Sequence, residues 1–316
     1  MARRRDSAGR GGPLGRGAHV SPLPVLCYHR VGGPLELGVT RVGRTVFARQ
    51  MTALARAGWR TLTLDEFAER SLTRQSAIRN PQSAFLLTFD DGYASLAHDA
   101  YPVLAELGFT ATTFLITDHV GANNTWDVRY TWRPLAHLDW RTVEQWRARG
   151  FDFASHTASH ARLTWLGDAR AADELSRARQ ALVQRLGASA GRAVAYPFGA
   201  ADARVQRLAR SAGYELGFCG VRGNGDAMSV PRVPVYVWDA ANVPLGLRED
   251  GLGSLGRFVA HLANRCAVGT SVLKGLGTRG SKPQSAARAP NPEPLAPHPP
   301  PSPSHDIPCP RRPSPP

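Results

Sequence analysis

The sequence of 316 residues contains no uninterrupted apolar stretch approaching the roughly 20 residues that a transmembrane helix needs. Residues 1–21 also lack the sustained apolar segment of a signal peptide and are instead rich in arginine, glycine and alanine. These two absences predict a protein without a membrane span, and the expected location is the cytoplasm.

Cysteine is scarce, and its four residues are scattered with no C-x-x-C pair among them: Cys27, Cys219, Cys266 and Cys309. This spacing indicates neither a disulfide framework nor a cysteine zinc site. Isolated cysteines of this kind are typical of small apolar side chains in a core.

Acidic residues are outnumbered, at 25 against 39 lysines and arginines, which gives a formal net charge of +14. Much of the excess lies at the two ends, before residue 17 and after residue 278. Such basic arms attract polyanions only non-specifically, so the charge does not predict a specific nucleic-acid partner.

More than half of the 25 prolines lie between Pro283 and Pro316. Chain of this composition has too few apolar residues to build a core, so residues 277–316 are predicted to be a disordered tail. Residues 1–21 are predicted to be a disordered basic arm. The globular domain is therefore expected to span residues 22–276.

Within that domain, short apolar runs alternate with segments of helical periodicity. Strands are predicted at 24–28, 61–64, 85–89, 110–116, 151–155, 193–196, 214–218 and 233–238. Helices are expected between them, including one continuous stripe over 96–107, whereas residues 70–83 are expected to form a loop. This alternation is typical of a parallel (β/α) barrel, whose active site is built at the carboxyl ends of the strands. We expect a distorted or incomplete barrel of about seven strands.

One predicted strand ends on two adjacent carboxylates, Asp90 and Asp91, followed by Gly92. Neighbouring carboxylates repel each other, so a fold that keeps both must compensate them. The simplest compensation is a cation held by one carboxylate while the other remains available as a base. The alternative is an Asp-Asp-Gly turn that caps the following helix.

A second predicted strand ends in His156 and His160. Two histidines four residues apart lie on the same side of one helical turn, a spacing that lets both imidazoles reach one metal ion. The alternative is a pair of unrelated exposed side chains. Together with Asp91, the two histidines have the composition of a hydrolytic zinc site.

Residues 121–140 form a long insertion rich in tryptophan. Loops of this length are usually functional or disordered, and tryptophan argues against disorder. Trp126, Trp132 and Trp140 either stack against sugar rings or anchor the loop on the barrel rim.

Three motifs, in their order and spacing, resemble the first three motifs of the polysaccharide deacetylases with a NodB-homology domain, of the carbohydrate esterase type. They are Thr-Phe-Asp-Asp-Gly at 88–92, Ser-His-Thr-Ala-Ser-His at 155–160 and Tyr-Pro-Phe-Gly at 196–199. Residues 24–31 and 111–114 resemble flanking pieces of the same family, so the resemblance covers roughly residues 23–240.

The resemblance implies a distorted (β/α) barrel that removes acetyl groups from an N-acetylated glycan. It implies a divalent metal, usually zinc, held by Asp91, His156 and His160, with Asp90 as the base. It also implies substrate contacts from the third motif, that is, from Tyr196, Pro197, Phe198 and Gly199.

Two positions depart from the family pattern. The arginine that commonly precedes the Pro-aromatic-Gly motif and orients the base is absent, since alanines stand there and only Arg192 is nearby. No late Leu-x-x-His motif is visible to supply the general acid. His29, at the first strand end, and His261 are the substitutes, and His29 is better placed because all strand ends open on one face.

Three interpretations follow from these motifs. The first is a metal-dependent N-deacetylase of a glycan. The second keeps the metal but changes the substrate to another non-peptide C–N amide, because no residue of the motifs is specific for recognition of a sugar. The third is an inactive carbohydrate-binding relic, which the two departures favour but the retention of both aspartates and both histidines disfavours.

Overall fold

The computed structural model describes residues 23–34, 40–72, 83–124, 135–221, 223–224, 226–237 and 239. The predicted basic arm and proline-rich tail lie outside these residues, as do Trp126, Trp132, His261, Cys266 and Cys309. The expected limits of the globular domain, 22 and 276, therefore remain predictions.

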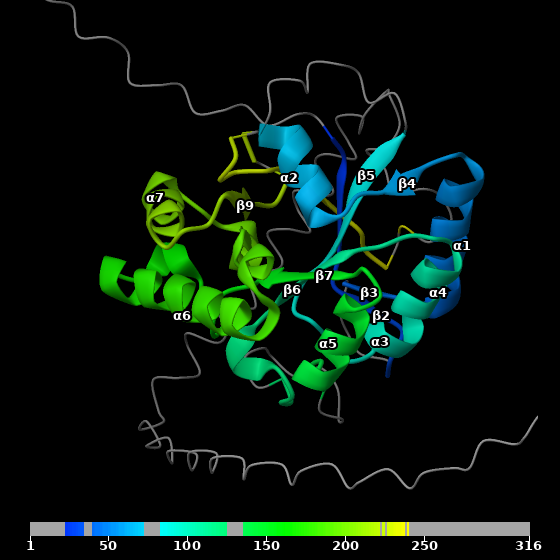
Figure 1. The fold of residues 1–316 in the computed structure, drawn as a ribbon, viewed down its shortest axis with the longest axis horizontal. Coiled ribbons are helices and arrows are strands. Elements are labelled where there is room, and N and C mark those ends of the chain that lie inside the picture. The colour runs from blue at the N-terminus through cyan, green and yellow to red at the C-terminus, as the bar shows by residue number, and fades with distance from the viewer. Residues whose placement is uncertain are drawn as a thin grey trace, which may run out of the picture. The chain divides into compact units, whose positions relative to one another are not determined.

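A parallel sheet forms the centre of the fold (Figure 1). Its main path has the order β10-β1-β5-β6-β7-β8-β9, and β4 pairs with β5 beside this path. The strands are β1 (Val25–Tyr28), β4 (Arg60–Thr61), β5 (Ala84–Phe89), β6 (Thr112–Leu115), β7 (Asp152–Ser155), β8 (Ala193–Ala195), β9 (Leu216–Phe218) and β10 (Val233–Pro234). A separate parallel pair joins β2 (Arg30–Val31) to β3 (Arg41–Val42). The apolar runs do not alternate with polar residues because the central strands are covered on both faces.

The two ends of this path are not paired with each other in the described part of the chain. β10 pairs with β1 at one end, while β9 makes an isolated parallel bridge to Val230, which precedes β10. The predicted incomplete (β/α) barrel of about seven parallel strands is thus confirmed.

Helices flank the sheet, as Figure 1 shows, with α6 and α7 on one side and α1, α3, α4 and α5 on another. Their bounds are α1 (Arg44–Arg56), α2 (Leu64–Leu72), α3 (Leu96–Asp99), α4 (Tyr101–Glu106), α5 (Trp140–Arg147), α6 (Asp168–Leu186) and α7 (Ala203–Ser211). None of the described helices is long and apolar enough to cross a membrane.

Two local predictions were wrong. The stripe over 96–107 is two short helices, because Pro102, the second residue of α4, has no N–H to continue the hydrogen-bond ladder of α3. The strand expected at 61–64 ends at Thr61, and α2 occupies part of the expected loop. A capping box starts α2, with Thr63 N donating to Glu66 Oε2 at 2.9 Å and Glu66 N donating to Thr63 Oγ1 at 3.1 Å.

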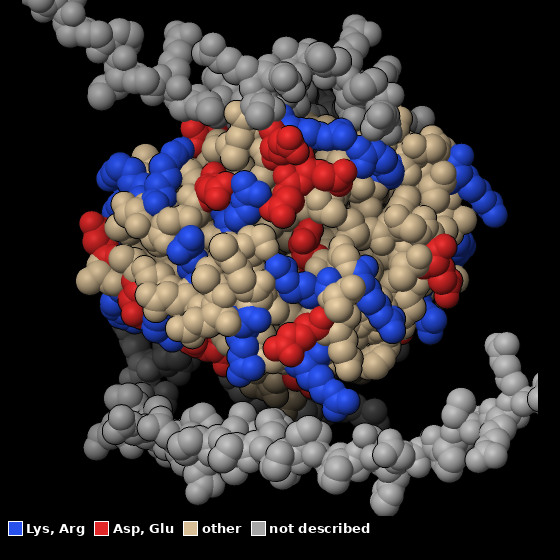
Figure 2. Space-filling model, viewed as in Figure 1, with Lys and Arg blue, Asp and Glu red and all other residues tan. Residues whose placement is uncertain are grey.

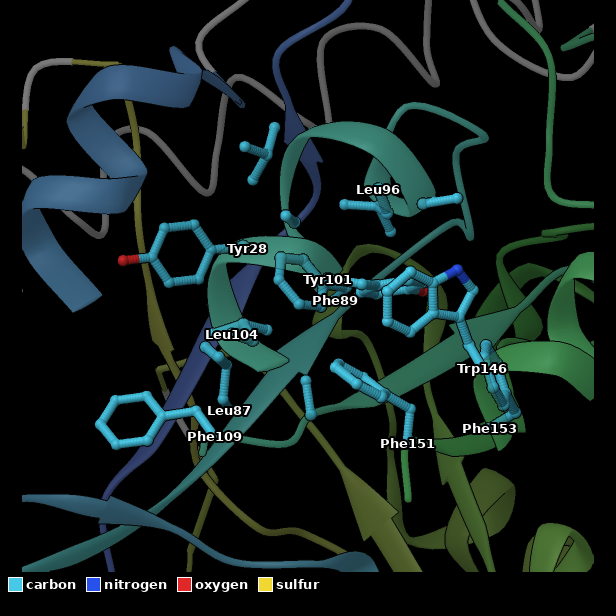
Figure 3. Close-up of a cluster of buried hydrophobic side chains, with 14 of the residues drawn as sticks. Tyr28, Leu87, Phe89, Leu96, Tyr101, Leu104, Phe109, Trp146, Phe151 and Phe153 are labelled. Carbon is cyan, nitrogen blue, oxygen red and sulfur yellow. The ribbon is translucent and has the colours of Figure 1, made fainter. Parts of the chain in front are cut away.

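The aromatic core between the sheet and α1, α3, α4 and α5 fixes the direction of the β5 side chains (Figure 3). The ring of Phe89 lies 5.9 Å from that of Phe47 and 6.1 Å from that of Tyr101. Successive side chains of a strand point to opposite faces. Asp90, which follows Phe89, therefore turns away from this core and toward the inner side of the sheet. Burying each such aromatic ring stabilises the arrangement by about 1.5–3 kcal/mol.

Charges of both signs are interspersed on the face seen in Figure 2. Arg192 illustrates the pairing, since its guanidinium lies 2.6 Å from Asp65 and 2.7 Å from Glu215. Cys27 and Cys219 are free and buried, as the scattered spacing predicted for small core side chains.

Candidate functional site

Three candidate metal ligands from two strand ends converge in the structure. Asp91 follows β5, and His156 and His160 follow β7. Asp91 Oδ1 lies 3.4 Å from His156 Nε2 and 3.5 Å from His160 Nε2, and all three side chains are buried. One ligand atom from each residue lies within 4.8 Å of the others. The structure therefore brings together the complete His, His, carboxylate set.

The hydrogen bonds of this set fit a divalent cation. His156 Nδ1 lies 2.8 Å from the carbonyl oxygen of Ala195, which can only accept, so this nitrogen carries the proton. The lone pair of a neutral imidazole then sits on Nε2, facing Asp91 Oδ1. That oxygen is buried and makes no hydrogen bond of ordinary geometry within the described residues. Two electron-rich atoms so placed repel each other unless a cation lies between them.

The electrostatics of the three groups suit the same interpretation. Burial, reinforced by the neighbouring His156, lowers the pKa of His160 to about 3, so its imidazole is neutral at pH 7. Burial raises the pKa of Asp91, but the two histidines outweigh this and hold it below its usual range. Burial lowers the pKa of His156, but Asp90 and Asp91 outweigh this and raise it. Either a proton or a metal ion on His156 Nε2 would be stabilised by the negative charges of Asp90 and Asp91.

Backbone strain is concentrated in the three motifs. Four of the five described non-glycine residues with positive φ belong to them: Asp91, Thr157, His160 and Phe198. Each such residue costs on the order of 1–3 kcal/mol and persists only where surrounding contacts hold it. The strain therefore marks a site whose geometry the fold maintains against local preference.

Glu174 of α6 provides one of these supporting contacts. This buried carboxylate accepts hydrogen bonds from Ala158 N at 3.1 Å, Ser159 N at 2.9 Å and Ser159 Oγ at 2.6 Å. It thereby fixes the turn that carries both histidines. Sequence reasoning missed Glu174, since a glutamate in an amphipathic helix carries no signal for this contact.

His137 supports the other side of the site. Its Nδ1 donates to the main-chain oxygen of Asp91 at 2.8 Å, and its ring stacks on Tyr93 with 5.2 Å between centroids. His137 belongs to the predicted insertion, whose described parts are residues 121–124 and 135–140. Trp140 begins α5 and packs against the core and Arg185, in keeping with the anchoring alternative for this tryptophan.

Asp90 is held differently from Asp91. Its Oδ1 accepts from Arg232 Nη1 at 2.7 Å and its Oδ2 from Arg232 Nη2 at 2.8 Å, and both side chains are buried. Burial raises the pKa of Asp90, but the Arg232 guanidinium more than offsets this and holds the pKa far below its usual range. With both oxygens engaged, Asp90 is oriented beside the ligand set, with its Oδ2 3.9 Å from His156 Nε2.

Arg232 thus takes the position for which the sequence offered only Arg192. Arg192 instead forms the exposed pairs with Asp65 and Glu215. Sequence reasoning missed Arg232 because it directly precedes β10, far along the chain. In the sheet only β1 lies between β10 and β5, so Arg232, next to β10, comes close to Asp90, next to β5.

His29 lies next to Asp90, immediately after β1. One ligand atom of His29 lies within 4.8 Å of those of Cys27 and Asp90. Its ring is half-buried, and its Nδ1 has no hydrogen-bond partner in the described part of the chain. The structure therefore brings His29 to the same end of the sheet as the three candidate ligands.

The third motif divides into buried and accessible parts. Tyr196 and Pro197 are buried, whereas Phe198 and Gly199 are half-buried. The Phe198 ring lies 4.9 Å from the ring of His160. Gly199 has a φ of 61°, and a Cβ there would lie 2.5 Å from the main-chain nitrogen of Gly220, so the tight turn requires glycine.

The sequence profile described as polysaccharide deacetylase matches residues 77–217, which contain all three motifs. The part of the chain that carries the three motifs is similar to the polysaccharide deacetylase family. The resemblance first seen in the motifs is therefore confirmed.

Similar proteins include the Bacillus subtilis (strain 168) protein described as putative polysaccharide deacetylase YxkH, 29% identical over 62% of this chain. The match spans 63% of the length of that relative. The Staphylococcus aureus poly-beta-1,6-N-acetyl-D-glucosamine N-deacetylase is 25% identical over 66% of this chain and 72% of its own.

Two solved structures share the fold. The structure of IcaB from Ammonifex degensii has a TM-score of 0.55 and 26% identity, covering 78% of this chain and 98% of that one. The Streptococcus pyogenes deacetylase PplD, solved in complex with acetate, has a TM-score of 0.59 and 21% identity, covering 68% and 92%.

Proposed function

We propose that this chain is a metal-dependent hydrolase that removes N-acetyl groups from an acetylated polysaccharide or oligosaccharide. The observation that carries the proposal is the convergence of Asp91, His156 and His160 beside an oriented carboxylate, Asp90. The match of residues 77–217 to the polysaccharide deacetylase model and the named activity of the Staphylococcus relative support the substrate class.

Asp91, His156 and His160 would hold a divalent metal, with zinc the first choice for two imidazoles and one carboxylate. Such an ion supplies Lewis acidity, which polarises an amide carbonyl and makes water acidic enough to attack near neutral pH. Asp90 would accept the proton of the attacking water, since its oxygens are fixed by Arg232 and it remains ionised. The main-chain N–H near Phe198 would help to stabilise the oxyanion that forms.

Acetate release from an oligomer of N-acetylglucosamine tests this function. We expect the full-length protein to release acetate and generate free amines, a chelator to abolish the release, and added zinc to restore it. Hydrolysis of simple non-sugar amides without release from the oligomer would favour the second interpretation, another C–N amide hydrolase. Binding of the oligomer without any hydrolysis would instead favour the inactive relic.

We propose His29 as the acid that protonates the departing amine, because amine leaving groups need a proton and His29 lies beside Asp90. An imidazole must be protonated to serve as an acid, so turnover that depends on it falls as the pH rises. His29→Gln is expected to lower turnover and to abolish this alkaline limb while metal content stays intact. The measurement is the pH–rate profile of both proteins, and survival of the limb in the variant would assign the proton to another donor.

A further inference from the structure

A row of side chains leads from the candidate metal centre to the protein surface. The His160 ring contacts the Phe198 ring, at 4.9 Å between centroids. The Arg162 guanidinium lies over the Phe198 ring at 5.6 Å and over the Trp165 ring at 5.0 Å. Trp165 ends the row and is 58% exposed. A ligand that reaches the metal centre along this row would therefore contact an open indole and a guanidinium.

Arg162 has no carboxylate partner in the described part of the chain, and unlike the exposed Arg170 it is partly buried. Its Nε and Nη1 are buried without a hydrogen-bond acceptor there. Burial lowers the pKa of its guanidinium, although the group stays charged at any physiological pH. By contrast, the neighbouring Arg204 reaches Asp168 at 2.9 Å and Arg177 reaches Asp118 at 3.0 Å. An unpaired, partly buried guanidinium gains from a ligand that supplies oxygen acceptors.

Trp165 supplies the complementary apolar surface. One face of its indole is covered by Arg162, and the large exposed fraction of the side chain leaves other surface open. Exposed aromatic rings next to polar groups are suited to amphipathic ligands such as sugar rings, which present C–H groups on their faces and oxygens around their edges.

We propose that Arg162 and Trp165 form a sugar subsite that accepts an N-acetylated unit and rejects a deacetylated one. This inference rests on the proposed function, because the metal centre would act on a neighbouring unit of the same glycan. A sugar whose acetyl group has been removed carries an ammonium, and the fixed positive charge of Arg162 repels it. An acetylated unit is neutral and offers its oxygens to the guanidinium. The enzyme would therefore space its deacetylations along the chain rather than extend a deacetylated block.

Binding to two tetramers of N-acetylglucosamine tests the subsite, one fully acetylated and one with a single glucosamine at one end. The protein is the full-length, zinc-loaded Asp90→Asn variant, in which turnover is suppressed, and affinities are measured by calorimetry at about pH 6, where the sugar amine is protonated. We expect the fully acetylated tetramer to bind about tenfold more tightly. Adding Arg162→Gln should reduce this preference to near unity, whereas Arg162→Lys should retain it because the charge remains.

Trp165→Ala should weaken the binding of both tetramers by roughly fivefold without changing the preference, since stacking does not depend on the amine. Arg170→Gln is the matched control, because Arg170 is an exposed arginine of α6, and the preference should persist there. Equal binding of the two tetramers, or a preference that survives Arg162→Gln, would overturn the proposal. A preference that disappears with Arg162→Gln in a protein whose wild type releases no acetate would sustain the subsite and remove the deacetylase function.

Discussion

Replacing His156 with alanine is expected to strip the divalent ion from the purified protein and to lower acetate release by roughly 10³-fold or more. The reason is geometric, because His156 Nε2 lies 3.4 Å from Asp91 Oδ1, and the Ala195 carbonyl holds its ring in the binding orientation. Metal content by atomic emission and acetate release by enzymatic assay are measured on the same samples.

His160→Ala should have the same effect. His98→Ala provides the control, because His98 is exposed on α3 and belongs to neither candidate metal group found among the described residues. A circular dichroism spectrum of each variant separates metal loss from unfolding. If both folded histidine variants keep the metal content of the wild type, the ion is bound elsewhere and the assignment of Asp91, His156 and His160 fails.

The meeting of these three residues could be predicted from the sequence because it follows from topology. In a parallel (β/α) arrangement every strand ends on the same side, so polar residues that follow different strands come together there. Asp91 after β5 and the two histidines after β7 needed no knowledge of the exact strand pairing. The apolar runs also located the strands, since each central strand is buried on both faces.

Contacts that depend on side-chain direction or on distant pairing could not be predicted in this way. Arg232 lies 142 residues from Asp90, and only the β10–β1–β5 order brings the two together. Glu174 reaches the histidine turn from the face of α6, which periodicity marks only as apolar or polar. Two other misses had local signals, namely Pro102 inside the stripe over 96–107 and the Thr63–Glu66 capping box.

Removing the charge of Asp90, which is buried against Arg232, is also expected to lower turnover strongly. Asp90→Asn should keep the metal, because both Asp90 oxygens bind Arg232 and Asp90 does not belong to the group of Asp91, His156 and His160. It should nevertheless lower turnover by about 10²–10⁴-fold, the usual contribution of a positioned base. Metal content and acetate release are again measured together. Loss of the metal in this variant would make Asp90 a ligand and contradict its role as the base.

Arg232→Leu should act mainly on stability, because it leaves a carboxylate buried without its partner. The expected loss in the free energy of unfolding is about 3–5 kcal/mol at pH 7, measured by urea denaturation. The double variant Asp90→Asn/Arg232→Leu should lose less than the sum of the two single losses, since it removes the unpaired charge. Losses that add to within about 0.5 kcal/mol would mean that the two side chains do not stabilise each other.

The difference in stability between wild type and Arg232→Leu should depend on pH in a defined direction. The pKa of Asp90 is lowered in the folded protein, because the attraction of Arg232 outweighs the effect of burial. A carboxyl of this kind stabilises the fold above its unfolded pKa of ~3.9, and the contribution is lost as the pH falls through the folded value. In Arg232→Leu the stabilising partner is gone, so wild type and variant should differ most near neutral pH. The gap between their urea midpoints should narrow as the pH falls below about 4, and a gap that instead widens there would place the stabilising charge on another group.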